Sequence, residues 1–331
     1  MDNKKTVAVL DSGAWGTALA AILHRGGYKV ILWSAFKDEA ENLAKTRKNP
    51  LLSDFTLPGD IVITADREAA REAFLAVLAV PSFALGEVAE SFNEVLGKDT
   101  VICNVAKGMN ADGRPFSELV REKLPSRPFV VLSGPSLAEE VAKGMPTAVV
   151  AASRDEGAAE LVQNAFSCDV LRVYVSTDEI GVQLGGAVKN VIALCAGISD
   201  GLGMGDNTKA ALITRGMAEI ARLGVAMGAD AETFSGLSCL GDLAVTCMSN
   251  LSRNHRAGEL MGKGVSAEDA VKRIGTVEGY YAARTALGLA KQYGVEMPIT
   301  EECCNICYNG ASPMEAITRL MSRPKKQEVI I

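Results

Sequence analysis

The chain has 331 residues, which corresponds to two domains at about 150 residues each. With 48% hydrophobic and 22% charged residues it can bury a substantial core, which excludes an intrinsically disordered protein. A net charge of −6 provides no general field for nucleic acid, so we expect no nucleic-acid partner, and any anion site must be a local cluster of cations.

The pattern of apolar residues and cysteines indicates a cytoplasmic protein. The longest apolar stretch covers residues 73–80, far short of the roughly 20 residues that span a bilayer, and no signal-peptide pattern precedes the first strand. We therefore expect no integral membrane segment. Cys304 and Cys307 form a C-x-x-C, but only two histidines are present to complete a zinc site. We interpret the pair as small buried hydrophobes and expect no metal.

The first half of the chain alternates strand-like and helix-like segments. The candidate strands are 7–10, 29–33, 60–64, 74–80, 100–104, 129–133 and 147–152. Continuous apolar strands with helical crossovers predict an α/β, Rossmann-like doubly wound sheet of parallel strands. Ligands of such sheets bind beyond the carboxyl ends of the strands. The segments expected to contact a ligand are therefore residues 11–16, 33–37, 80–82, 105–108 and 133–138.

The turn after the first strand resembles the dinucleotide-binding pattern G-x-G-x-x-G, with Asp11 in place of its first glycine. Gly13 and Gly16 retain the positions that let the backbone approach a pyrophosphate and let helix and strand pack closely. Aspartate tolerates left-handed dihedrals better than most residues, yet it brings a carboxylate towards two phosphates. The turn therefore predicts a dinucleotide site, and the Asp11 carboxylate is expected to lower its affinity.

The second half lacks strand alternation and predicts an all-α C-terminal domain. A capping box at 176–179 and a proline-led start at 312–315 mark two helices. We expect a dinucleotide-binding domain over 1–176, a helical substrate domain over 177–323 and a flexible tail over 324–331. The apolar, glycine-rich second half also suggests a homodimer.

Lys189 is the most distinctive residue of the helical half. Its helical neighbours one turn away are glycines and apolar residues, whereas a solvated face would carry charges. Two interpretations stay open: a buried lysine for proton transfer, or a lysine at a helix–helix contact whose ammonium reaches solvent.

Other polar residues lie where loops are expected. Arg253 could hold a phosphate or carboxylate by forked hydrogen bonds, and Asp242 could pair with a buried lysine; a surface salt bridge and a helix cap are the alternatives. Lys107 follows the strand at 100–104 and faces the expected crevice. The turn from Gly134 to Ser136 offers donors to an oxygen-rich ligand, although ordinary turn chemistry also explains it.

Together these segments resemble the bacterial type of NAD(P)-dependent glycerol-3-phosphate dehydrogenase over residues 5–320. The matching pieces are Trp15 to Ala20, Ala79 to Ser82, Lys107-Gly108, Gly134 to Ser136, Val188 to Asn190, Gly241 to Leu243, Ser252 to Asn254 and Val277 to Gly279. The resemblance implies hydride transfer between a nicotinamide cofactor and the pair dihydroxyacetone phosphate and sn-glycerol 3-phosphate, which supplies phospholipid synthesis.

The resemblance also implies residue roles. Lys189 would be the proton donor and acceptor, with Asp242 and Lys107 in the catalytic group. The substrate-binding set would be Lys107, Gly134, Ser136, Lys189, Asp242, Ser252, Arg253 and Asn254. The cofactor-binding set would be Gly13, Ala14, Trp15, Gly16, Lys107, Ala138, Arg253 and Glu278.

Three departures from the family pattern concern the cofactor. Asp11 replaces a glycine, Ala14 replaces a frequent serine, and Trp33 is not followed by the usual arginine or histidine. Ser34 and Lys37 could serve a 2′-phosphate, which favours NADP slightly over NAD. Two rival hypotheses remain: a related β-hydroxyacid dehydrogenase acting on another small anion, and a non-catalytic homologue whose cofactor binding Asp11 has impaired.

Overall fold

The computed structural model describes residues 4–110, 112–325 and 327–328. It consists of two compact units. The first contains residues 1–107 and 116–179, and the second contains residues 108–115 and 180–331. The predicted tail is described only in part, because residues 326 and 329–331 lie outside the described chain.

The first unit is built on an eight-stranded sheet, counted over the described residues, with the order β3-β2-β1-β4-β5-β6-β7-β8. The strands are β1 (Thr6–Leu10), β2 (Lys29–Trp33), β3 (Val62–Thr64), β4 (Leu75–Leu78), β5 (Val101–Asn104), β6 (Phe129–Ser133), β7 (Thr147–Ala152) and β8 (Leu171–Ser176). The chain reverses its direction of travel across the sheet between β1 and β4. This switch point is where doubly wound sheets form their ligand crevice.

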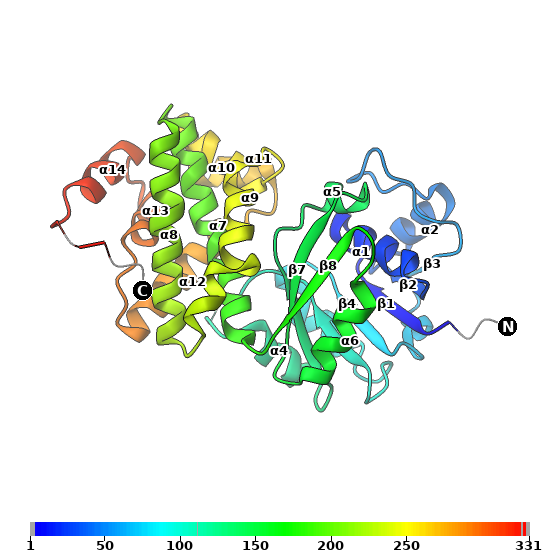
Figure 1. The fold of residues 1–331 in the computed structure, drawn as a ribbon. Helices are drawn as coiled ribbons and strands as arrows, with labels where there is room; N and C mark the ends of the chain where they lie inside the picture. Colours follow the sequence, from blue (N-terminus) through cyan, green and yellow to red (C-terminus); the bar gives the residue numbers. More distant parts are fainter. Residues whose placement is uncertain (1–3, 111, 326, 329–331) are drawn as a thin grey trace. The chain divides into compact units, whose positions relative to one another are not determined.

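Helices cover both faces of this sheet, as the predicted Rossmann-like fold requires (Figure 1). They are α1 (Ala14–Arg25), α2 (Lys37–Thr46), α3 (Leu85–Ser91), α4 (Phe116–Lys123), α5 (Ala138–Ala142) and α6 (Glu156–Phe166), with short 3-10 helices at Arg67–Ala70 and Ser82–Ala84. Successive strand residues point to opposite faces. Val7 and Val9 belong to the core beneath α1 and α6. The Trp33 ring packs edge to face against the ring of Phe92, which follows α3, with the two ring centroids 5.0 Å apart.

The prediction of an all-parallel sheet of seven strands is wrong in two details. β7 pairs antiparallel with β6 and parallel with β8; the connection from β6 to β7 holds only the five-residue helix α5, too short for a usual parallel crossover. β8 was missed because it alternates buried Leu171 and Val173 with exposed residues, whereas the prediction relied on continuous apolar runs.

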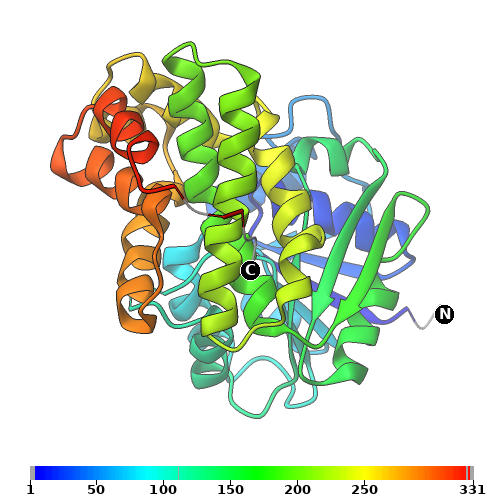
Figure 2. The same ribbon diagram turned by 60° about the vertical axis from the view of Figure 1, so that its left-hand side comes forward.

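The second unit is helical throughout its described part apart from its loops, as predicted. Its helices are α7 (Glu179–Gly201), α8 (Asp206–Ala226), α9 (Asp242–Met248), α10 (Arg253–Gly262), α11 (Ala267–Ile274), α12 (Glu278–Tyr293), α13 (Pro298–Asn309) and α14 (Pro313–Met321), with a 3-10 helix at Ala231–Ser235 and a π-helical turn at Leu237–Gly241. α7 and α8 run side by side (Figures 1 and 2). α14 starts at the predicted proline, Pro313.

Helix α7 forms the core of this unit. Length and composition alone would allow it to cross a membrane, but 89% of its most apolar window is buried inside the protein. Residues such as Val191, Ile192 and Leu194 are completely buried in the helical core. Its apolar composition therefore reflects packing against neighbouring helices rather than contact with lipid.

The contact between α7 and α10 is unusually close because both helices present glycines. A Cβ atom placed on Gly197 would lie 2.0 Å from the His255 carbonyl oxygen, and one on Gly258 would lie 2.1 Å from the Leu194 carbonyl oxygen. Gly201 and Gly262 repeat the pattern one turn further along. Only glycine allows the two backbones to approach this closely.

Gly258→Ala should lower the free energy of unfolding of the helical unit. The added methyl overlaps a backbone oxygen, and overpacking of this kind costs about 1–3 kcal/mol or more. Gly288→Ala on α12 is the matched control, because a Cβ there meets nothing within 4 Å and removing a helical glycine should stabilise by about 0.5–1 kcal/mol. Urea denaturation followed by circular dichroism measures both; equal effects of the two substitutions would contradict the close-packing argument.

Candidate active site

Lys189 is buried in the helical unit, with 4% of its surface exposed. Its ammonium donates hydrogen bonds to Asp242 Oδ1 at 2.7 Å and to Thr246 Oγ1 at 2.6 Å. The interpretation of Lys189 as a lysine that reaches solvent is therefore wrong. Asp242 is the first residue of α9 and is directed at the ammonium, so it is not the helix cap that we considered as an alternative.

The local fold brings these groups together through a close approach to α7. The π-helical turn 237–241 packs on Gly185, where a Cβ would lie 2.9 Å from the Cys239 Cβ atom. This turn delivers Asp242 to the start of α9, and Thr246 follows one helical turn later. Irregular turns of the π type are frequent at functional sites.

A chain of hydrogen bonds connects α7, α10 and α12 beside Lys189. Asn254 donates to Asn190 Oδ1 at 2.9 Å, and the Gly279 amide donates to Asn254 Oδ1 at 2.8 Å. The backbone of Gly279 also approaches Asn190 closely. The chain fixes the N-terminus of α12, where Glu278 is half-buried.

The start of α10 presents Arg253. Ser252 caps this helix by accepting a hydrogen bond from the His255 amide at 3.2 Å. His255 in turn pairs with Asp200, which also binds Lys209 at 2.8 Å. Arg253 is exposed, and within the described part of the chain it has no carboxylate at ion-pair distance. The surface salt bridge that we considered for Arg253 is thus not found among the described residues.

In the first unit, Lys107 lies against the turn that follows β6. Its ammonium donates to the Gly134 carbonyl at 2.9 Å and contacts Ser136 Oγ at 3.4 Å. Ser136 donates to the same carbonyl at 2.9 Å. Because β5 and β6 are adjacent and parallel, their carboxyl ends bring these three predicted residues together.

The turn between β1 and α1 adopts the geometry of a dinucleotide-binding loop. Asp11 has φ +104°, the left-handed region that usually needs glycine. Its carboxylate accepts a hydrogen bond from the Gly13 amide at 3.0 Å. Burial, more than the opposing hydrogen bond, raises the pKa of Asp11 above its ordinary value, and Glu39 adds to the rise.

The residues of this turn fit a pyrophosphate. A Cβ on Gly16 would lie 2.0 Å from the Asp11 carbonyl oxygen, so the helix can start this close to the strand only at a glycine. Helix α1 has no acidic residue in its first turn, and among the described residues no side chain caps it. The amides of Ala14, Trp15 and Gly16 are its first-turn donors, an arrangement that binds anions. Within the described turn 11–16, Asp11 is the only acidic residue, and its carboxylate opposes a phosphate.

The other predicted cofactor residues lie at element starts or ends. Ala138 begins α5. Ser34 is buried after β2, and its hydroxyl accepts from the Phe36 amide at 3.4 Å. Lys37 is exposed, and its Nζ atom lies 3.7 Å from Glu41 Oε1. The described residues contain no group of three or more histidine, cysteine or acidic side chains able to hold a metal ion.

Thr246 is the site residue that sequence reasoning missed. Its hydroxyl bonds both the Lys189 ammonium and, at 2.5 Å, the Asp242 carbonyl. The only signal in the sequence is its position four residues after Asp242, which places both residues on one face of a helix. That spacing was available, but a single threonine in an apolar segment is uninformative without the contact.

A Rossmann-like sheet with an anion-binding turn at its switch point, joined to a helical unit with a buried lysine–aspartate pair, defines a two-domain, dinucleotide-dependent dehydrogenase. The comparisons with known proteins give the family. Residues 6–159 match the model of the NAD-dependent glycerol-3-phosphate dehydrogenase N-terminus, and residues 178–318 match the model of its C-terminus. The chain belongs to the NAD-dependent glycerol-3-phosphate dehydrogenase family.

Individual relatives support this assignment. The glycerol-3-phosphate dehydrogenase (NAD(P)+) of Thermoanaerobacter sp. (strain X514) is 49% identical over 326 residues, covering 98% of each chain. The enzyme of the same name from Desulfitobacterium hafniense (strain Y51) is 47% identical, covering 98% of this chain and 93% of the relative. The crystal structure of glycerol-3-phosphate dehydrogenase from Coxiella burnetii superposes with a TM-score of 0.92 at 38% identity, covering 97% and 99% of the chains.

A more distant similarity concerns the fold alone. The PanE/ApbA family ketopantoate reductase from Ralstonia eutropha JMP134 superposes with a TM-score of 0.60 at 17% identity, covering 94% of this chain and 99% of that one. At 17% identity this match shows a shared fold and carries no information about the substrate. The names of the full-length sequence relatives favour the glycerol-3-phosphate dehydrogenase hypothesis.

Asp11→Asn should tighten dinucleotide binding. Asparagine retains an acceptor for the Gly13 amide and tolerates the positive φ, so the change isolates the charge. Repulsion near contact is worth ~1–4 kcal/mol at effective dielectrics of ~80 to ~20, or roughly five- to a thousandfold in affinity. Calorimetric titration with NADH and NADPH measures it, with Asp11→Gly as the companion variant that also relaxes the backbone.

The dinucleotide affinity measured by this titration should change with pH in one direction. Because the pKa of Asp11 is raised, the wild-type carboxylate takes up a proton at a higher pH than an ordinary aspartate. Wild-type affinity should therefore approach that of Asp11→Asn as the pH falls, and the gap should be widest at alkaline pH. Equal affinities at every pH would show that bound dinucleotide does not sense the carboxylate.

Proposed function

We propose that this protein interconverts dihydroxyacetone phosphate and sn-glycerol 3-phosphate with NAD or NADP, and that Lys189 is the proton donor and acceptor. The observation that carries the proposal is the Lys189 ammonium, buried against Asp242 and Thr246. The names of the full-length relatives give the substrate and the cofactor class. Production of glycerol 3-phosphate would supply phospholipid synthesis.

Lys189 performs the proton chemistry of this reaction. The nicotinamide cofactor, when bound, supplies the hydride in reduction and accepts it in oxidation. Negative charge develops on the carbonyl oxygen during reduction; an adjacent ammonium stabilises that charge and then transfers its proton. In oxidation the neutral amine takes the proton from the hydroxyl. Asp242 balances the buried ammonium, and Thr246 helps to orient it.

Arg253 is the proposed anchor of the substrate phosphate. A guanidinium binds a phosphate by two parallel hydrogen bonds, and Arg253 is exposed without a described carboxylate partner. Ser252 and Asn254 hold the backbone on either side of it through the helix cap and the link to Asn190. In the first unit the proposal assigns substrate contacts to Lys107, Gly134 and Ser136.

The remaining assignments concern the cofactor and the context. We assign cofactor contacts to Gly13, Ala14, Trp15, Gly16, Lys107, Ala138, Arg253 and Glu278. Lys37 and Ser34 are the residues that favour NADP slightly, because a lysine near a ribose 2′-position attracts a phosphate. We also propose a cytoplasmic homodimer, based on the apolar and glycine-rich helical half.

Lys189→Ala should abolish turnover, because general acid–base catalysis typically contributes 10²- to 10⁴-fold (a rough range) and the substitution also removes charge stabilisation. Oxidation of NADPH or NADH by dihydroxyacetone phosphate measures the loss. The variant should still bind dinucleotide, because the turn at 11–16 belongs to the other unit. Wild-type activity in Lys189→Ala would rule out the proton-transfer role.

A double variant controls for folding. Lys189→Ala leaves the buried carboxylate of Asp242 without its ammonium partner, which is itself destabilising. Lys189→Met combined with Asp242→Asn removes both charges, and its thermal unfolding should lie closer to wild type. Turnover should nevertheless stay absent; recovered turnover would mean that the single variant lost activity only because it unfolded.

Arg253→Gln should raise the KM for dihydroxyacetone phosphate more than it lowers kcat. Hydrogen bonds to a charged group are worth about 1.5–3 kcal/mol, or roughly 10- to 150-fold in binding. Lys263→Gln, at the far end of α10 where Lys263 pairs with Glu259, is the control and should leave KM unchanged. A parallel panel of small carboxylate substrates tests the β-hydroxyacid hypothesis; faster turnover of a carboxylate by the wild type would favour that alternative.

A further inference from the structure

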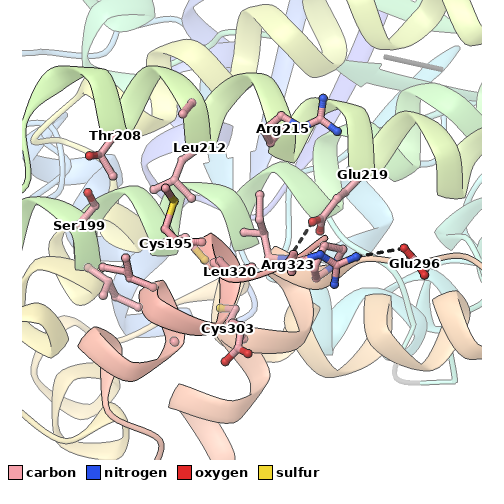
Figure 3. Close-up of a pocket in the computed structure, with 18 of the residues that line it drawn as sticks. Cys195, Ser199, Thr208, Leu212, Arg215, Glu219, Glu296, Cys303, Leu320 and Arg323 are labelled. Atoms are coloured by element: carbon pink, nitrogen blue, oxygen red, sulfur yellow. Dashed lines mark hydrogen bonds and ion pairs between the residues drawn. The ribbon is translucent and has the colours of Figure 1, made fainter. Parts of the chain in front are cut away.

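A cavity of about 1220 Å³ lies within the helical unit. Its walls come from α7, α8, α13 and α14, together with the segments that precede α13 and follow α14 (Figure 3). Lys189, Asp242 and Thr246 are not among the described residues that line it, so it is separate from the proposed proton-transfer group. Small-molecule sites typically enclose about 300–1,000 Å³, so this cavity is large enough to bind a ligand of that kind.

The cavity follows α8 and changes character along it. Thr208 near the start of this helix and Arg222 near its end both line the cavity. At a rise of 1.5 Å per residue, these two positions lie about 21 Å apart along the helix. Figure 3 shows the hydroxyls of Ser199 and Thr208 at one end, and Leu212 between this end and Arg215. The space therefore suits an elongated ligand.

Most of the remaining wall is apolar. Each of the four helices contributes aliphatic side chains, which are Ile198, Leu212, Ile299, Ile306, Ile317 and Leu320. A wall of this kind favours a ligand whose apolar surface leaves water on binding.

Ser199 is the first sign that the cavity serves a ligand. Its side chain is 3% exposed, and its hydroxyl has no hydrogen-bond partner among the described residues. An unsatisfied buried hydroxyl costs free energy, and the large majority of such groups in native proteins have a partner. Because Ser199 lines the cavity, a polar group of a bound molecule can be that partner.

Two arginines give the other end of the cavity a positive charge. Arg215 and Arg222 are seven residues apart on α8, which places them on one face of the helix. Arg222 donates a hydrogen bond to the Glu296 backbone carbonyl at 3.0 Å. Within the described part of the chain, neither guanidinium has a carboxylate at ion-pair distance. A guanidinium presents a fork of donors that matches the oxygen atoms of an acidic group.

The carboxylates on the wall offer little opposition to an anion. Glu296 pairs with Arg323 at 3.1 Å, and Glu302 pairs with an arginine outside the lining. Glu219 accepts hydrogen bonds from two amides at the start of α13, at 2.7 and 3.2 Å, and burial raises its pKa to about 7. Glu328 is exposed, so solvent screens its charge.

We propose that this cavity binds a small organic anion with an elongated apolar body, whose acidic group lies at the end that Arg215 and Arg222 make cationic. The aliphatic wall covers the apolar body, and the Ser199 hydroxyl meets a polar group at the far end. The site belongs to the helical unit alone, so its occupancy does not depend on the proposed oxidoreductase activity.

The test titrates the folded, full-length protein with two probes that fluoresce more strongly in apolar surroundings. Anilinonaphthalene sulfonate is an apolar anion, and phenylnaphthylamine has the same ring system without the charge. Both should bind the wild type. Arg215→Gln combined with Arg222→Gln should weaken binding of the sulfonate roughly 10- to 150-fold, the range for hydrogen bonds to a charged group. Binding of the uncharged amine should not change.

Two further variants locate the probes. Leu320→Trp places a larger ring in the cavity from α14, so it should weaken binding of both probes. Arg256→Gln combined with Arg273→Gln is the matched control, because these two arginines are exposed on α10 and α11 and do not line the cavity. This control should bind both probes as the wild type does. Far-ultraviolet circular dichroism of every variant ensures that folded proteins are compared.

The proposal is overturned by any of three results. The first is wild-type affinity for the sulfonate in the variant that lacks Arg215 and Arg222, or an equal loss in the control that lacks Arg256 and Arg273. The second is unchanged binding of both probes by Leu320→Trp. The third is displacement of the sulfonate by NAD, which would place the probe at the dinucleotide turn of the other unit.

Discussion

The backbone contact between α7 and α10 is the constraint on which the helical unit depends. Gly197 and Gly258 allow the two helices to approach until a single methyl group would overlap a carbonyl oxygen. Because α7 carries Lys189 and Asn190 and α10 carries Arg253 and Asn254, this contact fixes the spacing of both ends of the proposed substrate site. The close packing of the two helices thereby sets the distance between Lys189 on α7 and Arg253 on α10.

Burying the Lys189–Asp242 pair costs free energy that a hydrophobic pair of similar volume would not. The desolvation of two charges can exceed their mutual attraction, and the hydrogen bond to Thr246 recovers only part of that cost. Such a pair is therefore poor evidence of a stabilising role and better evidence of a chemical one. The apolar core around α7 supplies the stability that allows the helical unit to hold it.

The sequence predicted what depends on local pattern and missed what depends on contacts between distant segments. The seven strands β1 to β7 and the glycine turn follow from apolar periodicity and turn chemistry, and Lys189 was found because its neighbours on the helix are uncharged. The antiparallel pairing of β7 depends on the geometry of a short connection. The contact of Thr246 with Lys189 depends on which helices pack together, which no periodicity within one helix reveals.

Asp11 shows how a sequence departure changes meaning once its hydrogen bonds are known. In sequence it is a charge in place of a glycine. In the structure its backbone adopts the positive φ that the turn needs, and its carboxylate holds the Gly13 amide. A glycine there would leave that amide to a ligand, whereas aspartate satisfies it within the protein and shapes the loop before any ligand arrives. Asp11 thus completes a hydrogen bond within the turn and places an anion beside the remaining donors of α1, so this one residue satisfies the Gly13 amide and opposes a bound phosphate.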